Sequence, residues 1–246
     1  AALAFAGGSW ARAAQLFERV LARARGNLMA AVQLAACRSF LGREREALEA
    51  FELARRIDPR SIEVRHYLGL HHLKYGQVDR AGPLLEAVLA SQPDRLAAME
   101  GLAQVRVRQG RLAEAAALLE RAVPLSGDPG TRLVEAGLLR MRLGETAPAL
   151  AALERARGLQ GIAFRRDLEL GVLFLAAGRL EEARDALDRV PRSHPDAPMA
   201  LFKRAQVSVL LGEADRQERV RAARAGADAT TRRLIEGERL FEGLLP

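Results

Sequence analysis

Seven glycines stand 34 residues apart along the chain, without one insertion or deletion between them. They are Gly8, Gly42, Gly76, Gly110, Gly144, Gly178 and Gly212. With 21 glycines in 246 residues, six successive matches at one spacing would arise by chance roughly once in a few million trials. The 34-residue period is therefore a structural repeat, and the chain is expected to fold as a row of similar units.

Three more positions keep the same period. Five residues after the glycine stand Ala13, Ala47, Ala81, Ala115, Ala149 and Ala183. Seven residues before it the chain has only small residues, namely Ala1, Ala35, Gly69, Ala103, Gly137, Gly171 and Ala205. Nine residues after it stand the bulky residues Phe17, Phe51, Leu85, Leu119, Leu153 and Leu187. A fixed alternation of small and bulky residues predicts one packing arrangement used repeatedly.

Each period contains two apolar stretches of helical spacing, such as Leu34, Cys37 and Leu41, which predict a pair of helices. The repeated glycine follows the first helix, where a helix C-terminus often needs a positive φ. The small residues on either side of it allow the two helix backbones to approach closely, and the bulky residue fills the space between them. We therefore expect an all-α chain of helical hairpins.

The pattern resembles the tetratricopeptide repeat family, whose 34-residue unit combines Leu-Gly, an aromatic residue, Ala-x3-Phe and a final Pro. The second period reads Ala31-x2-Leu34-Ala35-x2-Arg38, then Ala47-x3-Phe51 and Pro59. The family's aromatic position departs from this pattern in most periods, where it holds Arg38, His72, Arg106, Arg140 and Ser208. The resemblance implies a right-handed superhelical solenoid of about seven helix-turn-helix hairpins.

The period divides residues 1–246 into one expected solenoid. Its repeats are 1–27 (partial), 28–61, 62–95, 96–129, 130–163, 164–197 and 198–231, followed by a capping helix at 232–246. Because the first repeat lacks half of its first helix, we expect a segment before Ala1. The second helix of repeat seven carries Gln217, Arg221 and Arg224 where earlier repeats have core residues, so we expect that helix to be polar.

Composition and charge narrow the function classes. The chain is 49% hydrophobic and has no uncharged apolar run of the length that spans a bilayer, so we expect a soluble protein of the cytoplasm or periplasm without membrane insertion. The net charge of +7 is spread over the periods, each lying between −1 and +3, and only Lys74 and Lys203 are lysines. Without a basic domain or tail, the sequence does not favour nucleic-acid binding. The richness in Ala, Leu and Arg is typical of a bacterial protein.

The resemblance also implies where a partner would bind, because the family lines its concave groove with residues from each first helix. The residues at these positions include Val32, Ala36, Ser39, Phe40, His66, Leu70, Leu73, Lys74, Glu100, Gln104, Val107, Arg108, Val134, Leu138, Met141, Arg142, Leu168, Val172 and Leu175. Repeat seven adds Met199, Phe202, Gln206, Val209 and Leu210. Such a groove would suit an amphipathic helix or an extended segment with apolar anchors and some carboxylates.

Other interpretations of this groove stay open. The bases Lys74, Arg108 and Arg142 stand at helix C-terminal ends, where a cation is favourable without any ligand. The apolar residues could instead hold a part of the longer parent chain or a second copy, so self-association stays open. Relatives that bind chaperone tails use a clamp of Lys and Asn, whereas this chain has residues such as Val32 and His66 there.

The sequence gives little support for a metal site, a cofactor or a catalytic residue. His71 and His72 follow His66 by five and six residues, whereas two ligands on one helix need a spacing near four, so no metal site is predicted. Cys37 lies between apolar neighbours and is expected to be a buried thiol. No phosphate-binding loop, cofactor fingerprint or nucleophile motif is present, so no catalytic residue or cofactor is expected.

We therefore predict a protein-interaction scaffold or adaptor, not an enzyme. Two alternatives stay open. The chain could be the recognition or regulatory domain of a larger enzyme of sulfotransferase or glycosyltransferase type, or a scaffold of an envelope machine that secretes exopolysaccharide.

Overall fold

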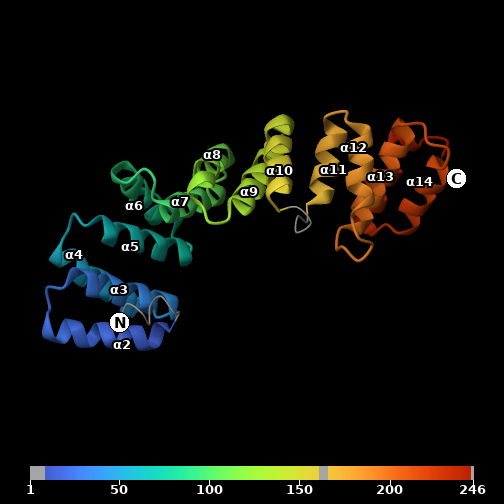
Figure 1. Cartoon of the computed structure of the whole chain (residues 1–246). Coiled ribbons are helices and arrows are strands. Elements are labelled where there is room, and N and C mark those ends of the chain that lie inside the picture. The colour runs from blue at the N-terminus through green and yellow to red at the C-terminus, as the bar shows by residue number, and fades with distance from the viewer. Residues whose placement is uncertain (1–8, 161–165, 245–246) are drawn as a thin grey trace. The chain divides into compact units, whose positions relative to one another are not determined.

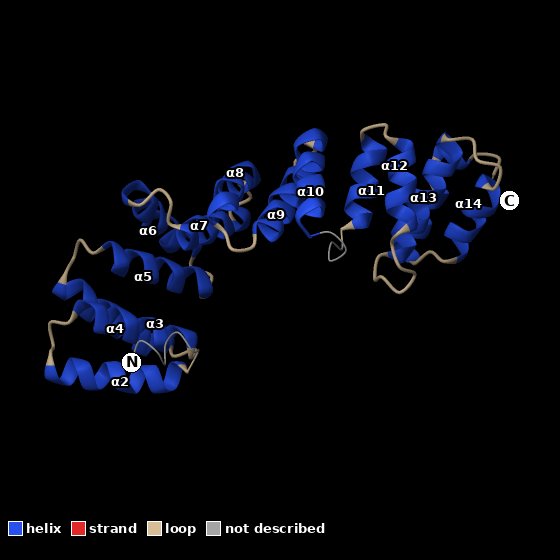
Figure 2. Ribbon diagram, in the orientation of Figure 1, coloured by secondary structure: helices blue, strands red, loops and turns tan. Residues whose placement is uncertain are grey.

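The computed structural model describes residues 9–160 and 166–244, and every regular element in those ranges is helical (Figure 2). Contacts between residues group the chain into two compact units, Ala1–Leu125 and Ser126–Pro246. The division falls at the end of the predicted fourth repeat. None of the described helices combines the length and the apolar character needed to cross a membrane.

The first unit holds three complete helical hairpins and the second helix of an earlier one (Figure 1). Its elements are α2 (Trp10–Arg23), α3 (Leu28–Phe40), α4 (Glu44–Ile57), α5 (Ile62–Lys74), α6 (Val78–Ser91), α7 (Leu96–Arg108), α8 (Leu112–Ala122) and a 3₁₀ turn (Val123–Leu125). Asn27 and Ser61 are the N-cap residues of α3 and α5, and each side chain accepts a hydrogen bond from the backbone N–H three residues on.

The second unit has three hairpins and a short closing segment. Its elements are α9 (Pro129–Arg142), α10 (Thr146–Gln160), α11 (Asp167–Ala176), α12 (Leu180–Asp188), α13 (Ala197–Leu210), α14 (Arg216–Ala225), α15 (Ala229–Glu236) and the 3₁₀ turn η3 (Arg239–Phe241). The predicted capping helix 232–246 is thus shorter than expected. It ends at Glu236, and after Gly237 the side chain of Glu238 accepts a hydrogen bond from Leu240 N, which starts the separate turn η3.

The repeated glycine has the predicted role in all six periods that the structure describes at this position. Gly42, Gly76, Gly110, Gly144, Gly178 and Gly212 have φ between 69° and 78°, whereas Gly8 lies outside the described residues. The next residue donates its N–H back to the carbonyl five positions earlier, as Gln77 does to His72 at 2.8 Å. This is a Schellman motif, which ends the first helix and reverses the chain.

The small and bulky positions of the period meet inside each hairpin. Leu85 is fully buried against Gly69, where an added Cβ would lie 3.0 Å from Leu85 Cγ. The fit is tighter at Gly171 of the second unit, where an added Cβ would lie 2.5 Å from Leu187 Cγ. The first helix therefore needs a small residue here, so that the bulky residue of the second helix can reach its backbone.

Ion pairs join consecutive repeats at the position where the family has an aromatic residue. The eleventh residue of repeat four, Arg106, is buried and binds Glu86 of the preceding hairpin and Glu114 of its own. Arg38 contacts Glu18 and Glu46 in the same way in repeat two. The guanidinium groups thus take the place of the aromatic rings, and their charge is neutralised by acids from two helices.

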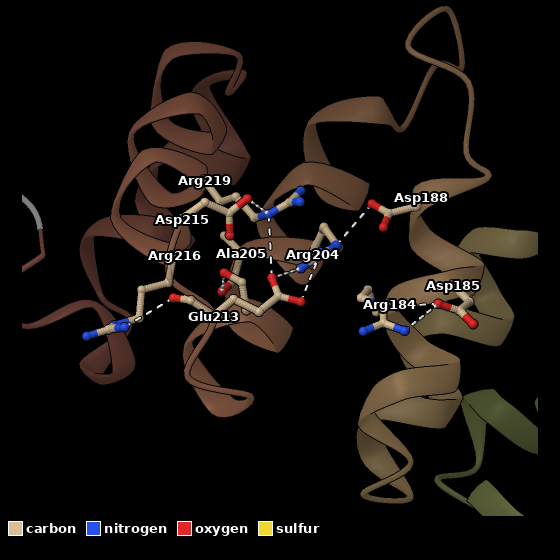
Figure 3. A network of polar contacts seen from close by, with 10 residues as sticks. Arg184, Asp185, Asp188, Arg204, Ala205, Glu213, Asp215, Arg216 and Arg219 are labelled. Carbon is tan, nitrogen blue, oxygen red and sulfur yellow. Dashed lines mark hydrogen bonds and ion pairs between the residues drawn. The ribbon is translucent and has the colours of Figure 1, made fainter.

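The last junction of the second unit uses a related network from a different position. Arg204 of α13 is buried, donates to Asp188 of α12 at 3.0 Å, and binds Glu213 after α13 (Figure 3). Glu213 and Asp215 also bind Arg219, which holds the loop before α14. In repeat seven Ser208 is too short for this contact, so Arg204, one turn earlier, makes it instead.

The second helix of repeat seven is shifted along the sequence. In five other hairpins this helix begins two residues after the repeated glycine, but α14 begins at Arg216, four residues after Gly212. Val220, Ala223 and Ala227 are buried in place of the expected positions. Gln217 and Arg221 are exposed because of this shift, so the helix has a buried side despite the polar residues at the expected core positions.

Candidate interaction groove

The first unit contains a groove of about 510 Å³ formed by the first helices of three consecutive repeats, α3, α5 and α7. Eight of the residues predicted to line such a groove contribute to it, namely Ala36, Ser39, Phe40, Leu70, Leu73, Lys74, Gln104 and Arg108. Tyr67 and His71 also line it. The lining is apolar and aromatic, contains two cations, and includes no carboxylate.

Two aromatic residues, Phe40 and Tyr67, line this groove. Phe40 is 55% exposed although it is large and apolar, and its ring stacks on Trp10 of α2 with centroids 4.4 Å apart. Tyr67 adds a second ring to the lining. An exposed, pre-positioned phenylalanine can bury apolar surface of a ligand at little cost in conformational entropy.

The two cations of the groove also have a structural role. Lys74 Nζ donates to the carbonyl oxygens of Ser39 and Phe40, the last of these at 3.3 Å, and Arg108 Nη1 donates to the carbonyl of Leu73 at 2.8 Å. Each base therefore satisfies carbonyl groups at the C-terminal end of the first helix of the preceding repeat. The positive charge remains at the groove, but part of its hydrogen-bonding capacity is already used.

The remaining predicted groove residues of the first unit lie outside this lining. Val32 and His66 are buried, with exposed fractions of 0% and 4%, and Glu100 and Val107 are half-buried. In the second unit Val134 of α9 is buried and Arg142 is exposed. Leu138, Met141, Leu168, Val172 and Leu175 are half-buried on α9 and α11.

The groove face of repeat seven is covered by the chain itself. Phe202 and Gln206 of α13 are buried, and the ring of Phe241 meets Phe202 edge-on with centroids 6.0 Å apart. Gln206 Nε2 donates to the carboxylate of Glu238, and Lys203 donates to Gln206 at 3.0 Å. These two predicted positions are therefore not open to a partner, because the closing segment packs on them.

His66 and His71 of α5 are both buried, and His71 lines the groove. Burial, helped by the nearby charge of Arg95, lowers the pKa of His66 to about 4. Burial also lowers the pKa of His71 to about 4, with smaller effects from His72 and Lys74. His71 Nδ1 pairs with Ser39 Oγ at 2.9 Å. These rings are neutral at pH 7 and serve as packing and hydrogen-bonding groups.

Sequence reasoning missed two of the groove-lining residues, Tyr67 and His71, and the supporting ring of Trp10. Tyr67 and His71 stand one residue after the positions that the family resemblance implies for their helix. The signal that was available is the spacing Tyr67, Leu70, His71 and Lys74, which places all four on one helical face.

Solved structures of low sequence identity share the fold. MamA residues 41 to end from Desulfovibrio magneticus RS-1 are 20% identical, with a TM-score of 0.56, and the match covers 64% of this chain and 89% of that one. PilF from Pseudomonas aeruginosa is 18% identical, with a TM-score of 0.57 and coverages of 88% and 95%. YrrB, described as a tetratricopeptide repeat protein with an unusual peptide-binding site, is 16% identical, with a TM-score of 0.54 and coverages of 92% and 100%.

No curated protein matches the chain. Family models described as tetratricopeptide repeat match residues 4–69, 68–129, 134–198 and 168–229, which together span most of the sequence. The helical hairpins, the positive-φ glycines and these matches agree. The chain belongs to the tetratricopeptide repeat family.

Proposed function

We propose that the protein is an interaction scaffold that binds a peptide or helix of a partner protein in the groove between α3, α5 and α7. The observation that carries the proposal is this groove itself, whose lining comes from three consecutive repeats and includes the exposed Phe40 and the half-buried Tyr67 and Leu70. A ligand there would contact three repeats at once, which favours a segment several residues long over a small molecule. The protein would act by recognition and not by catalysis.

The lining suggests the chemistry of the bound segment. Phe40, Tyr67 and Leu70 offer apolar surface for a large aliphatic or aromatic side chain. Lys74 and Arg108 place positive charge beside it with no carboxylate in the lining. We therefore expect an apolar anchor next to an acidic residue. The fold shared with YrrB, described as having an unusual peptide-binding site, is compatible with peptide recognition.

The test compares partner capture by three folded variants. Leu70→Arg places a charge on the groove floor, Arg108→Glu reverses a groove charge, and Leu159→Arg introduces the same charge on the exposed side of α10, outside the groove. Proteins captured from a lysate of the native host are identified by mass spectrometry, and the bound segment is mapped by cross-linking. A synthetic copy of that segment is then titrated while the fluorescence of Trp10 is followed.

We expect the segment to bind the parent and Leu159→Arg with equal affinity. It should bind Leu70→Arg with an affinity about tenfold or more below that for the parent. Trp10, the single tryptophan, should report binding because its ring stacks on Phe40. If the segment binds Leu70→Arg and Arg108→Glu as tightly as it binds the parent, the groove is not the recognition surface. Circular dichroism of each variant ensures that a loss of binding is not a loss of fold.

A further inference from the structure

A second cleft opens on a different side of the first unit, between repeats two and three. It has a volume of about 440 Å³ and is lined by residues of α4, α5 and α6. Its apolar lining includes Val64, Leu68 and Leu84, and its polar lining is mainly basic. None of its lining residues also lines the groove.

The helix α5 separates the two sites. Tyr67, Leu70, His71 and Lys74 line the groove, whereas Val64, Arg65, Leu68 and His72 line the cleft. At 100° per residue, the mean directions of these two sets lie more than 90° apart around the helix axis. A ligand in the cleft would therefore leave the groove accessible.

Repeat three, which borders the cleft, departs from the ion-pair pattern of its neighbours. In repeats two and four the arginine at the eleventh position, half-buried as Arg38 and buried as Arg106, binds a glutamate at the nineteenth position of its own repeat. In repeat three the eleventh residue is the smaller His72, and the nineteenth is Arg80, which reverses the charge. The corresponding ion pair therefore cannot form in repeat three.

Repeat three also differs from its neighbours at a third position, where it carries an additional charge beside the cleft. The fourth position is Ala31 in repeat two and Met99 in repeat four, but it is Arg65 in repeat three. Within the described residues Arg65 makes no side-chain hydrogen bond or ion pair, and Arg80 makes only a long hydrogen bond of 3.5 Å to Gln77. Two guanidinium groups thus border one cleft without a carboxylate partner.

The other charges at the cleft do not neutralise this pair. Arg55 also lines the cleft, but it is bound to Glu52 at 3.0 Å. Asp79 is the one carboxylate in the lining, and no contact joins it to Arg65 or Arg80 in the described structure. His72 is buried, with its Nδ1 held by Gln77 at 2.7 Å. The lining therefore keeps an excess of positive charge over an apolar floor.

We propose that this cleft is a second binding site, which takes an acidic peptide segment carrying a leucine-sized apolar side chain beside its carboxylates. Arg65 and Arg80 would each bind a carboxylate through paired N–H donors. Leu68 and Leu84 would bury the apolar side chain. A densely charged polyanion fits less well, because Asp79 would repel it and the apolar floor would contribute nothing to its binding. A volume of about 440 Å³ is enough for two or three residues.

The experiment uses the full chain labelled with ¹⁵N at arginine and follows the Nε–Hε signals of Arg65 and Arg80, assigned from single Arg→Lys variants. The probe is the acetylated tripeptide amide Glu-Leu-Glu at constant ionic strength. Gln-Leu-Gln amide controls for the apolar side chain alone, and inorganic phosphate controls for any anion. We expect a saturable shift of these two signals with Glu-Leu-Glu and little change with either control.

Variants complete the test. Arg65→Gln with Arg80→Gln should weaken binding by about tenfold or more, whereas Arg60→Gln, an exposed arginine outside the cleft, should leave it within about twofold. Leu70→Arg should leave this binding unchanged, which separates it from the groove. The proposal is wrong if Glu-Leu-Glu gives no saturable shift, if phosphate shifts the signals equally, if the double variant binds as well as Arg60→Gln, or if Leu70→Arg removes the binding.

Discussion

Arg106 Nε donates to Glu114 Oε2 across 3.1 Å, and the same buried guanidinium also binds Glu86 of the preceding repeat. The arginine side chain is only 6% exposed, whereas both glutamates are about half exposed. The contact therefore combines packing of the arginine stem with a partly solvated ion pair. Its contribution to stability depends more on filling the space than on charge.

Arg106→Ala should destabilise the first unit by about 2 kcal/mol, because it leaves a cavity between three helices. Arg106→Phe, which restores the kind of residue found in the family pattern, should stay within about 1 kcal/mol of the parent, since apolar replacements of buried ion pairs are often neutral. Urea unfolding followed by Trp10 fluorescence measures both. Arg45→Ala, which removes an exposed pair with Glu49, is the control and should cost under about 0.5 kcal/mol. An equal loss for Arg106→Phe and Arg106→Ala would show that charge, not packing, dominates, because both variants remove the charge and only Phe fills the space.

The first unit should lose stability in mild acid. His66 and His71 have a lowered pKa of about 4 in the fold, whereas an unfolded histidine titrates near 6.5. Below pH 6.5 the unfolded chain therefore binds protons that the folded chain does not, so the stability present above pH 6.5 is lost as the pH falls toward 4. At pH 5 each of the two rings should lower the free energy of unfolding by about 2 kcal/mol relative to its value above pH 6.5.

The measurement is the free energy of unfolding in urea at pH 7 and pH 5. His66→Gln should lose less stability than the parent over this range, by about 2 kcal/mol. His194→Gln is the control, because His194 is the one histidine of the second unit and is partly exposed. An equal acid loss in the parent and His66→Gln would mean that His66 is protonated without unfolding.

Gly171→Ala should destabilise the second unit by about 1–3 kcal/mol, because the new methyl group would meet Leu187 Cγ at 2.5 Å. Gly158→Ala, in the same unit and also within a helix, has open space around it and should instead gain about 0.5–1 kcal/mol from helix propensity. Thermal unfolding followed by circular dichroism compares the two variants. Opposite signs are expected, and a gain for both would show that Leu187 can move aside at little cost.

Cys37 should be inert in the folded protein. The thiol is fully buried, and burial raises its pKa to about 11, so little thiolate exists at pH 8. Ellman's reagent should therefore react only as urea unfolds the first unit, with the same midpoint as the change in Trp10 fluorescence. Rapid release of one equivalent of thiolate product in native buffer would contradict the buried position.

The sequence predicted the repeated parts of the fold well, since each depends on residues close together in the chain. The 34-residue period located the hairpins, the positive φ of Gly42 and its equivalents, and the contact of Leu85 with Gly69. The helical shift in repeat seven was not predictable from this spacing, because the network of Glu213, Asp215 and Arg219 that holds the loop is absent from the other repeats.

The candidate groove was predicted less completely. Family positions located Phe40, Leu70 and Arg108 in the groove. Val32 and His66 are buried and do not line it, since their exposure depends on how closely neighbouring first helices stack.

The ion pairs between repeats could also have been predicted from a pattern in the sequence. An acid recurs at the twenty-fifth position of six successive periods, at Glu18, Glu52, Glu86, Glu120, Glu154 and Asp188.

The ion pairs between repeats give the row a direction. In the pair between repeats three and four, the base Arg106 comes from the later repeat and the acid Glu86 comes from the earlier one. Such repeats are complementary when they follow one another in the same direction. If one repeat were reversed, it would place like charges opposite each other. Gain or loss of a whole 34-residue unit would keep each base opposite an acid, so the array can change length in evolution without redesign of its joints, whereas a change of any other size would misalign them.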